Sequence, residues 1–210
     1  MLAKIPNLLK HLLPHRLWNF PPEEKALYLT FDDGPIPEVT PWVLEQLKTF
    51  QAKASFFCIG DNVRKNPEVF RKIIAGGHAI GNHTHNHLNG WRTSSEKYIR
   101  NVQQAREEME CIGKGTQKLF RPPYGRLTDK QATMLRESGF RIVMWDVLSV
   151  DYNRRLSSER CLQNVLKNAG PGSIVVFHDS LKAEKNLKAV LPQVLEYYSR
   201  QGFEFRAISV

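Results

Sequence analysis

The sequence predicts an α/β protein built on a mostly parallel sheet with helical crossovers. Three observations support this fold class. Seven short apolar or β-branched runs are spread along the 210 residues. Longer segments with helix-start and helix-end signals separate the runs, which is typical of parallel strands joined by helices. Polar residues also cluster directly after several runs, where ligand sites of parallel α/β folds lie.

The expected strands are short and rich in β-branched and aromatic residues. They are residues 26–31 (ALYLTF), 54–59 (ASFFCI), 78–82, 119–120, 141–145, 173–177 and 203–208. No linker, charge block or repeat divides the chain. The length suits one domain, and we place residues 1–22 as an N-terminal extension and residues 23–210 as the domain itself.

Capping signals mark the expected helices between these strands. Thr40–Pro41 and Asn66–Pro67 each pair a capping residue with a proline at the first helical position. Thr93 with Glu96, and Thr128 with Gln131, have the spacing of capping boxes. Two further helices are expected, at about 158–168 and about 184–200.

Composition excludes several classes of protein. Hydrophobic residues make up 41% of the chain, which argues against a disordered chain. No apolar run has the length of a membrane span. The three cysteines, Cys58, Cys111 and Cys161, are odd in number and form no CxxC pair, so we expect reduced core thiols. A net charge of +9 is compatible with an anionic partner or with a solvated surface, and no nucleic-acid recognition motif accompanies it.

The first 20 residues (MLAKIPNLLKHLLPHRLWNF) mix leucines with basic residues, and two prolines interrupt them. They lack the unbroken apolar stretch and cleavage site of a signal peptide. Two interpretations remain open. Short basic amphipathic turns can lie on an anionic membrane surface. Alternatively, Leu8, Leu9, Leu12, Leu13 and Trp18 pack against the outside of the domain, which we favour.

Five strand ends carry chemically active residues. They read Asp32-Asp33-Gly34-Pro35, His83-Thr84-His85-Asn86-His87, Arg121-Pro122-Pro123-Tyr124-Gly125, Asp151-Tyr152 and His178-Asp179. Neighbouring extended residues point in opposite directions, so one aspartate of the first pair can bind a cation while the other acts as a base. A solvated Asp-Gly turn is the ordinary alternative.

His83 and His87 are four residues apart, which on a helical turn places both rings on one face within reach of one divalent ion. His85 points away in that arrangement. With a carboxylate from another strand end, the two histidines form an open three-ligand site of the catalytic type. Arg121 sits in a proline-stiffened segment, and His178 emerges from a buried strand with a pKa suited to a general acid at neutral pH.

The segments 30–35, 83–87 and 121–125 closely resemble the first three motifs of the NodB-homology polysaccharide deacetylases, carbohydrate esterase family four. The resemblance extends from about residue 26 to the C-terminus. It implies a distorted (β/α)7-type barrel of mostly parallel strands with outer helices. It also implies metal-dependent hydrolysis of an N-linked acetyl group, with an O-linked group as the alternative, on a glycan or amino sugar.

The resemblance also implies roles for individual residues. Asp33, His83 and His87 correspond to ligands of one divalent ion, expected to be Zn²⁺ with Co²⁺ or Ni²⁺ as alternatives. Asp32 corresponds to the base that deprotonates the metal-activated water, and His178 to the general acid. Arg121 would orient and tune Asp32, and Asp151 would do the same for His178. The backbone N–H of Tyr124 would stabilise the oxyanion, and Tyr124, Pro123, Tyr152 and Val176 would contact substrate.

The departures from the family pattern lie late in the chain. Leu148 stands where an aspartate is usual, Tyr152 replaces a tryptophan, and Val176 replaces a leucine. These positions shape the acyl pocket, so the identity of the substrate stays open at this point.

Three functions therefore remain. The first is deacetylation of a glycan, and the second is deacylation of a lipid-linked sugar at a membrane surface through residues 1–20. The third is a non-catalytic carbohydrate-binding module on the same fold. Because we find neither an export signal nor a transmembrane helix, we expect a cytoplasmic or membrane-peripheral location.

Overall fold

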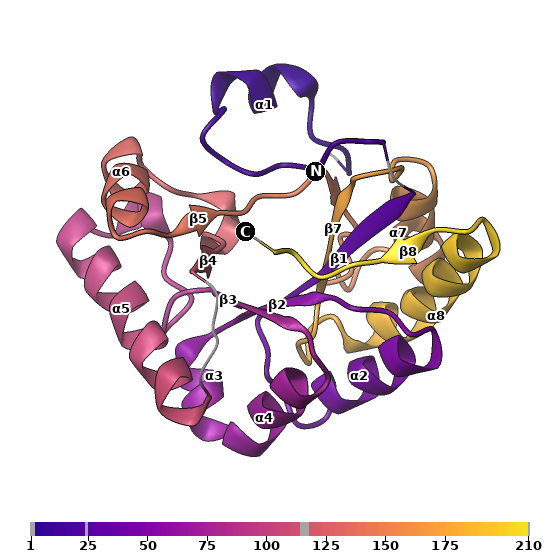
Figure 1. The fold of residues 1–210 in the computed structure, drawn as a ribbon, viewed down its shortest axis with the longest axis horizontal. Helices are drawn as coiled ribbons and strands as arrows, with labels where there is room; N and C mark the ends of the chain where they lie inside the picture. Colours follow the sequence, from indigo (N-terminus) through magenta and orange to yellow (C-terminus); the bar gives the residue numbers. More distant parts are fainter. Residues whose placement is uncertain (1–2, 24, 114–117, 210) are drawn as a thin grey trace.

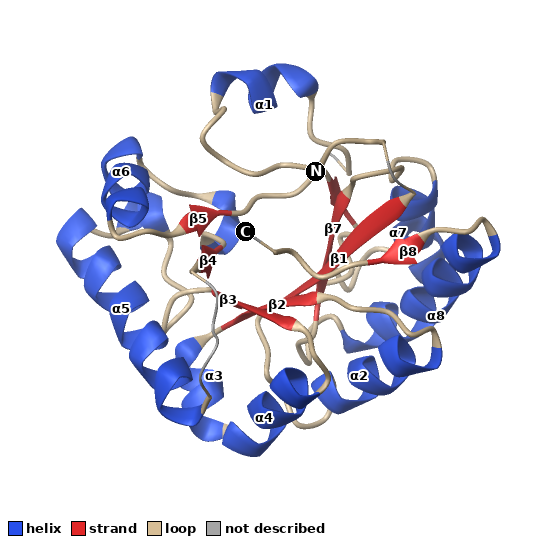
Figure 2. Cartoon of the chain, in the orientation of Figure 1, coloured by secondary structure: helices blue, strands red, loops and turns tan. Residues whose placement is uncertain are grey.

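The structure, a computed structural model, describes residues 3–23, 25–113 and 118–209 (Figures 1 and 2). Its strands are β1 (Ala26–Asp32), β2 (Ser55–Cys58), β3 (Ala79–Asn82), β4 (Leu119–Phe120), β5 (Arg141–Ile142), β6 (Val147–Leu148), β7 (Ile174–His178) and β8 (Glu204–Phe205). Its helices are α1 (Asn7–Leu12), α2 (Thr40–Thr49), α3 (Gly60–Lys65), α4 (Pro67–Ala75), α5 (Ser95–Ile112), α6 (Asp129–Glu137), α7 (Ser158–Leu166) and α8 (Glu184–Arg200). Two 3₁₀ turns, η1 (Gly90–Arg92) and η2 (Pro123–Gly125), complete the set.

The sheet confirms the predicted α/β barrel. Its strand order is β5-β4-β3-β2-β1-β7-β6, every paired strand is parallel, and β8 adds to the start of β1. The sheet is curled, with helices on its outside (Figure 2). Parallel strands need such crossovers, because each strand must return to the same end before the next one begins.

Strand β1 lies at the centre of the fold. It pairs with β2 on one side and with β7 on the other, and all its residues except Tyr28 are buried. Phe31 stacks against Phe56 of β2 and Phe177 of β7, with ring centroids 5.0 and 6.1 Å apart. This packing fixes the carboxyl ends of three neighbouring strands, which is where the chemically active side chains begin.

Most expected elements are present, and the differences have local causes. The capping box between Thr128 and Gln131 is formed as predicted. The cap of α5 is Ser94 rather than Thr93, with the Ser94 hydroxyl accepting from the Lys97 amide. The strand expected at 141–145 ends at residue 142: the Val143 amide still donates to the Phe120 carbonyl of β4, but Val143 is bridged to Leu17 and the Met144 amide donates to the Leu17 carbonyl. The elements α1, α3 and β6 were not predicted; β6 has only two residues.

The N-terminal segment closes the gap between β5 and β6, the two edges of the curled sheet. Leu17 forms a parallel bridge with Val143, and Lys4 forms an antiparallel bridge with Val147. The helix α1 projects outward between α6 and α7 (Figure 1). Residues 1 and 2 of the expected extension lie outside the described residues, but the described part is hydrogen-bonded to the sheet.

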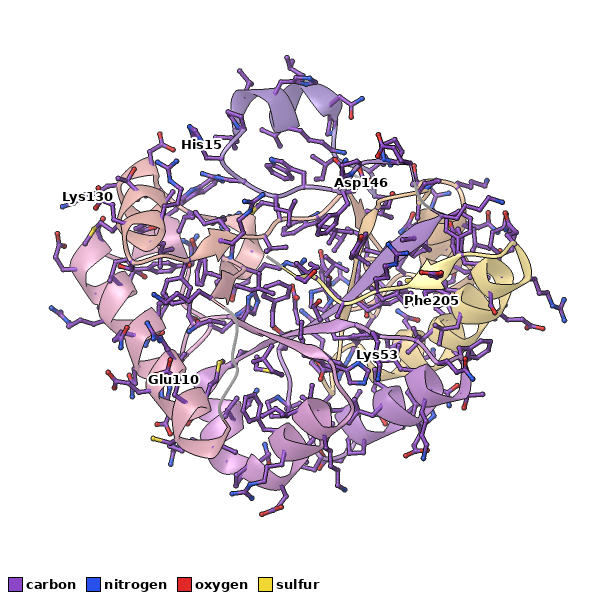
Figure 3. All side chains as sticks on the ribbon, viewed as in Figure 1. His15, Lys53, Glu110, Lys130, Asp146 and Phe205 are labelled. Atoms are coloured by element: carbon purple, nitrogen blue, oxygen red, sulfur yellow. The ribbon has the colours of Figure 1, made fainter. Side chains whose placement is uncertain are left out.

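Asp146 anchors this segment (Figure 3). Its buried carboxylate accepts from Lys4 Nζ at 2.7 Å, from Lys10 Nζ at 2.6 Å and from the Ser173 hydroxyl at 2.6 Å. Burial raises the pKa of Asp146, but the hydrogen bonds from Lys10, Lys4 and Ser173 outweigh it and hold the pKa below its ordinary value. Two of the basic residues that suggested a membrane surface are therefore engaged inside the protein.

The leucines of α1 do not pack as favoured. Trp18 is buried and Leu13 packs partly against the core, but Leu8 and Leu12 are 72% and 67% exposed and Leu9 is 39% exposed. The expectation that all of them cover the domain is wrong for these three, because no residue of α1 is buried and the helix projects outward (Figure 1). Among the described residues, no helix has the length and apolar character needed to span a bilayer.

The cysteines are free. Cys58 and Cys161 are buried in the core as expected, whereas Cys111 is exposed on α5, contrary to the expectation of a core thiol. Burial raises the pKa of the Cys58 and Cys161 thiols, which keeps them protonated and unreactive at neutral pH.

Candidate active site

The carboxyl ends of β1 and β7 place Asp32 and His178 side by side. The two residues are register partners in the parallel pairing of these strands. Their backbones stay connected beyond the strands, since the Asp179 amide donates to the Asp32 carbonyl at 3.1 Å. A carboxylate and an imidazole that are 146 positions apart in the chain thus begin from adjacent points of one rim.

Asp32 and Asp33 face different partners, as their alternation predicts. The Asp32 carboxylate is nearly buried and accepts from Arg121 Nη1 at 2.7 Å. The next residue, Asp33, leaves the strand with a φ of 84°, a left-handed conformation that a non-glycine residue seldom adopts. Its carboxylate Oδ1 lies 3.3 Å from His87 Nε2 and 3.8 Å from His83 Nε2.

Arg121 is fully buried and held on every side. Its Nη1 also donates to the Thr30 hydroxyl, its Nη2 to the Met144 carbonyl, and its Nε to the Val143 carbonyl. The guanidinium carbon lies 4.0 Å from the centre of the Phe57 ring. Burial lowers the pKa of Arg121, and the Asp32 carboxylate opposes that shift. So many fixed contacts leave the Asp32 carboxylate one orientation.

His83 and His87 converge, but not through a helical turn. Residues 83–89 form an irregular loop in which Thr84 and His87 have φ values of 65° and 55°. The two ring centroids are 5.0 Å apart. The two rings lie together as the spacing of four predicted, but the predicted helical turn is absent. Two residues with left-handed backbone bend the loop instead, and this brings the rings together. His85 is not part of the group.

The three side chains fit a divalent cation. One ligand atom from each of Asp33, His83 and His87 lies within 4.8 Å of the others. The Asp33 Oδ1 atom is buried and accepts no hydrogen bond from any described residue, so a charged oxygen is left without a partner. Two imidazole nitrogens and one carboxylate oxygen are a common donor set for Zn²⁺ and similar ions.

Both histidines are electrically neutral, as metal ligands must be. Burial lowers the pKa of His83 to about 3, and it also lowers the pKa of His87. The His83 Nδ1–H donates to the Arg121 carbonyl at 2.7 Å, which leaves the Nε2 lone pair facing Asp33. His87 Nδ1 lies 3.1 Å from the Tyr124 hydroxyl, so its Nε2 is likewise directed to Asp33. The carbonyl contact fixes the tautomer of His83, and the hydroxyl contact orients the His87 ring.

Asp151 controls the ionisation of His178. One carboxylate oxygen lies 2.8 Å from His178 Nδ1, and the other accepts from the His178 amide at 2.8 Å. Burial favours the neutral ring, but the charge of Asp151 and its hydrogen bond outweigh it and raise the pKa of His178 to about 9. The ring is therefore protonated at neutral pH, with its other nitrogen free to donate.

Tyr124 stands over the histidine pair. The residue is 61% exposed, and its backbone φ is 60°. Its ring meets the His87 ring edge-on, with centroids 4.6 Å apart. Most non-glycine residues with left-handed backbone lie around this rim. They are Asp33, Thr84, His87, Tyr124 and Val150, whereas Gln51 lies elsewhere. Strained backbone of this kind persists where the surrounding fold over-determines it, and it clusters at functional sites.

A cavity of about 760 Å³ joins these residues. Eight of the residues expected from the sequence line it, namely Asp32, Asp33, His83, His87, Tyr124, Tyr152, Val176 and His178. Arg121 and Asp151 lie behind the wall, where they hold Asp32 and His178. Both prolines are buried, and Pro122, not the expected Pro123, lines the cavity.

Sequence reasoning missed several lining residues. They are Leu88, Asn89, Arg92, Arg126, Trp145 and Lys182, together with Leu148, which was noted only as a departure. Most lie within five positions of a segment that was singled out, so continuing each strand-end loop a few residues would have found them. Their chemistry alone gives no signal, because exposed arginines and lysines occur throughout the chain.

Asp179 also has a larger role than a turn residue. It is fully buried, and its carboxylate accepts from the Gly34 amide at 3.0 Å and from the Thr40 hydroxyl at 2.6 Å. A Cβ at position 34 would lie 2.0 Å from Asp179 Oδ2, so only glycine fits there. Burial raises the pKa of Asp179 to about 8. The residue after His178 thus fixes the loop after Asp33.

Comparison with known proteins agrees with this geometry. Residues 20–143 match the family model described as polysaccharide deacetylase. A peptidoglycan-N-acetylglucosamine deacetylase of Bacillus cereus is 35% identical over 193 residues, covering 91% of this chain and 90% of the relative. A chitooligosaccharide deacetylase of Azorhizobium caulinodans is 38% identical over 157 residues, covering 74% of each chain.

Solved structures show the same fold. A peptidoglycan N-acetylglucosamine deacetylase superimposes with a TM-score of 0.88 at 31% identity, covering 92% of this chain and 91% of the other. A pseudoenzyme of carbohydrate esterase family four from Bacillus anthracis superimposes with a TM-score of 0.83 at 26% identity, covering 91% of this chain and 66% of the other. Because the second protein is described as a pseudoenzyme, the fold alone does not determine activity.

Proposed function

Because the chain belongs to the polysaccharide deacetylase family, we propose that it hydrolyses the N-acetyl group of an N-acetylated glycan in the cavity at the carboxyl ends of β1, β3, β4 and β7. Chitooligosaccharide and peptidoglycan N-acetylglucosamine units, the substrates named for its relatives, are the substrate class. One observation carries this proposal: Asp32 and His178, a buried carboxylate and a protonated imidazole, flank the group of Asp33, His83 and His87 in one cavity.

Asp33, His83 and His87 would hold one divalent ion. When bound, the ion supplies Lewis-acid polarisation of the acyl carbonyl and lowers the pKa of water. Neutral imidazoles favour Zn²⁺ over Mg²⁺ or Ca²⁺, which prefer oxygen ligands, and Co²⁺ and Ni²⁺ accept the same donors. Three protein ligands are the number found at catalytic rather than structural zinc sites.

Asp32 and His178 would move the protons. Asp32, fixed by Arg121, accepts a proton from the attacking water, and the Tyr124 amide donates to the negative charge that develops on the carbonyl oxygen. His178, kept protonated by Asp151, donates to the departing nitrogen. Without that proton an amine is a very poor leaving group, so a high pKa for His178 suits amide hydrolysis at neutral pH.

A product assay tests this function. The metal-loaded protein is incubated with N-acetylglucosamine oligomers, with peptidoglycan glycan strands and with an O-acetylated glycan that has no N-acetyl group. We expect acetate and free amine in equal amounts from the first two substrates and slow release from the third. Acetate without new amine would assign an esterase instead. No acetate from any of the three would contradict the proposal.

The arrangement of the site disfavours a silent carbohydrate-binding module. Every side chain assigned to proton transfer or to the ion is present, and the partners of each are in contact with it. Equal binding of substrate by the wild-type protein and Asp32→Asn, with no turnover by either, would nevertheless assign the binding role.

The exposed leucines of α1 favour a second candidate, deacylation of a lipid-linked sugar at a membrane surface. Leu8 and Leu12 project from a helix in which no residue is buried, and His11 and His15 lie beside them. Lys4 and Lys10 are bound to Asp146, so insertion of leucine rather than attraction by lysine would supply most of the affinity. On this proposal the protein is peripheral to the membrane.

Vesicle co-sedimentation separates the two candidates. Leu8→Ser/Leu12→Ser should abolish binding to vesicles of phosphatidylglycerol and phosphatidylcholine, while Tyr197→Ser, at another exposed apolar position, should bind as the wild type does. Deleting residues 1–20 is a poorer test, because it removes backbone bonds to β6 and to residues 142–144. If the wild-type protein stays in the supernatant, the membrane candidate fails.

A further inference from the structure

Three cationic side chains line the cavity without an assigned role. Arg92 and Arg126 come from the segments that follow β3 and β4, and Lys182 from the segment that follows β7. Because β1 lies between β3 and β7 in the sheet, the two arginines and the lysine occupy different sides of the rim around Asp32.

Among the described residues, none carries a charge that neutralises any of the three. In the described part of the chain, no carboxylate lies within ion-pair distance of Arg92, Arg126 or Lys182. Of the cavity's own carboxylates, Asp32 forms an ion pair with Arg121, and Asp33 lies beside the two neutral histidines. A cleft lined by unpaired charges of one sign concentrates ligands of the opposite sign.

Aromatic rings hold two of these cations in place. The Arg126 guanidinium lies 5.1 Å from the centre of the Trp91 ring, and Trp91 is 65% exposed. On the other side, the Lys182 ammonium lies 5.5 Å from the centre of the Tyr152 ring. Arg154 steadies the Lys182 segment through hydrogen bonds to the Leu181 and Lys182 carbonyls. Cations stacked on rings are pre-positioned, and exposed rings also stack on the apolar faces of sugars.

We propose that Arg92, Arg126 and Lys182 are specificity-determining residues that select N-acetylated glycans bearing carboxylate groups over neutral ones. The guanidinium groups bind a carboxylate on the sugars that lie toward β3 and β4, and Lys182 binds one on the sugars toward β7. The inference rests on the proposed deacetylase function and adds the chemistry of the substrate outside the acetyl group.

Kinetics on three substrates of equal length test the inference. The first is a neutral N-acetylglucosamine oligomer, and the second alternates N-acetylglucosamine with its 3-O-lactyl ether, which carries a carboxylate on the sugar. The third is the second with a short acidic peptide amide-linked to each lactyl group, so that the carboxylates lie on the peptide. We expect the wild-type kcat/KM to be about tenfold higher for one or both acidic substrates than for the neutral one.

The charge-removed triple variant Arg92→Gln/Arg126→Gln/Lys182→Gln should bring this ratio close to one. The loss should appear in KM rather than kcat, because the three side chains are assigned neither to proton transfer nor to the ion, and the wild-type ratio should fall as salt is added. The second and third substrates identify whether sugar-borne or peptide-borne carboxylates are recognised.

A matched control removes the same charge elsewhere. Lys48→Gln/Lys72→Gln/Arg141→Gln changes three exposed cations outside this cavity and should keep the wild-type ratio. Equal wild-type kcat/KM on neutral and acidic substrates, or a preference that survives in the rim triple variant, would overturn the inference and leave the deacetylase function intact. Absence of turnover on all three substrates would instead contradict the proposed function.

Discussion

Asp151 binds His178 at two points, through the ring nitrogen Nδ1 and through the backbone amide, each at 2.8 Å. Asp151 is itself fully buried and is held by Asn186, whose side chain donates to the Asp151 carbonyl. The pair therefore fixes both the position and the charge of His178 without using the ring nitrogen that faces the cavity.

Replacing Asp151 with asparagine should move the alkaline limit of activity to lower pH. The pKa of His178 is raised to about 9, so on the proposed mechanism the wild-type enzyme should lose its general acid only as the pH rises through that value. Asparagine removes the negative charge, so the pKa of His178 falls. The pH dependence of kcat and an NMR titration of His178 measure the shift. Tyr152→Phe keeps the charge and should leave the limit in place; an unmoved limit in Asp151→Asn would contradict this role.

Asp32→Asn should lower kcat by about 10²- to 10⁴-fold, the usual contribution of a general base. The amide has nearly the same shape and can still contact Arg121, so folding and ion content should be retained. Steady-state kinetics and metal analysis on the same preparation make the measurement. Near-normal turnover would remove Asp32 from the proton transfer.

His83→Ala and His87→Ala should each abolish binding of about one equivalent of Zn²⁺, because the remaining two ligands cannot hold the ion tightly. Isothermal titration of the chelator-treated protein with Zn²⁺ measures the stoichiometry. His85→Ala, in the same loop but outside the ligand group, is the control and should bind as the wild type does. Full binding by both ligand variants would show that the ion lies elsewhere.

Asp146→Asn should destabilise the fold by about 1–3 kcal/mol, the range for leaving buried hydrogen-bonding groups unsatisfied. Loss of the ion pair with Lys10 should contribute most of this destabilisation, because the Lys10 side chain is less exposed than that of Lys4. The folded pKa of Asp146 is depressed, so its contribution is present above its unfolded pKa and is lost as the pH falls through the folded value. Urea unfolding at pH 7 should give a lower free energy of unfolding for the variant than for the wild type. At pH 3 the difference between the two free energies should be smaller.

That destabilisation has a structural readout as well. If Asp146 holds the N-terminal segment, limited proteolysis of Asp146→Asn should cut within residues 3–20 before the wild type is cut. Lys188→Met, which removes a half-exposed ion pair with Glu184, should change neither the stability nor the cleavage pattern appreciably. Identical unfolding curves for the Asp146 variant and the wild type would show that the segment is held by its backbone bonds alone.

Much of the fold is determined by local sequence. The Asn66–Pro67 and Thr128–Gln131 signals placed the starts of α4 and α6, because such signals act over a few neighbouring positions. The bounds expected for α8 also match, although the helix has no side-chain cap. The apolar runs likewise identified β1, β2 and β7. The alternation of strand and helix then predicted a parallel sheet, in which all strands end at the same edge. Residues that directly follow a strand were therefore expected to meet at that edge.

Tertiary structure decided the remainder. The length of β5 depends on Leu17, which pairs with Val143 from 126 positions away, and no local pattern contains that contact. The convergence of His83 and His87 depends on left-handed backbone at Thr84 and His87, which the fold imposes against local preference. That Arg92, Arg126 and Lys182 have no carboxylate partner among the described residues is also a property of their surroundings. Sequence specifies which groups are available, whereas distance and burial, which set their charge and partners, arise only when distant segments pack together.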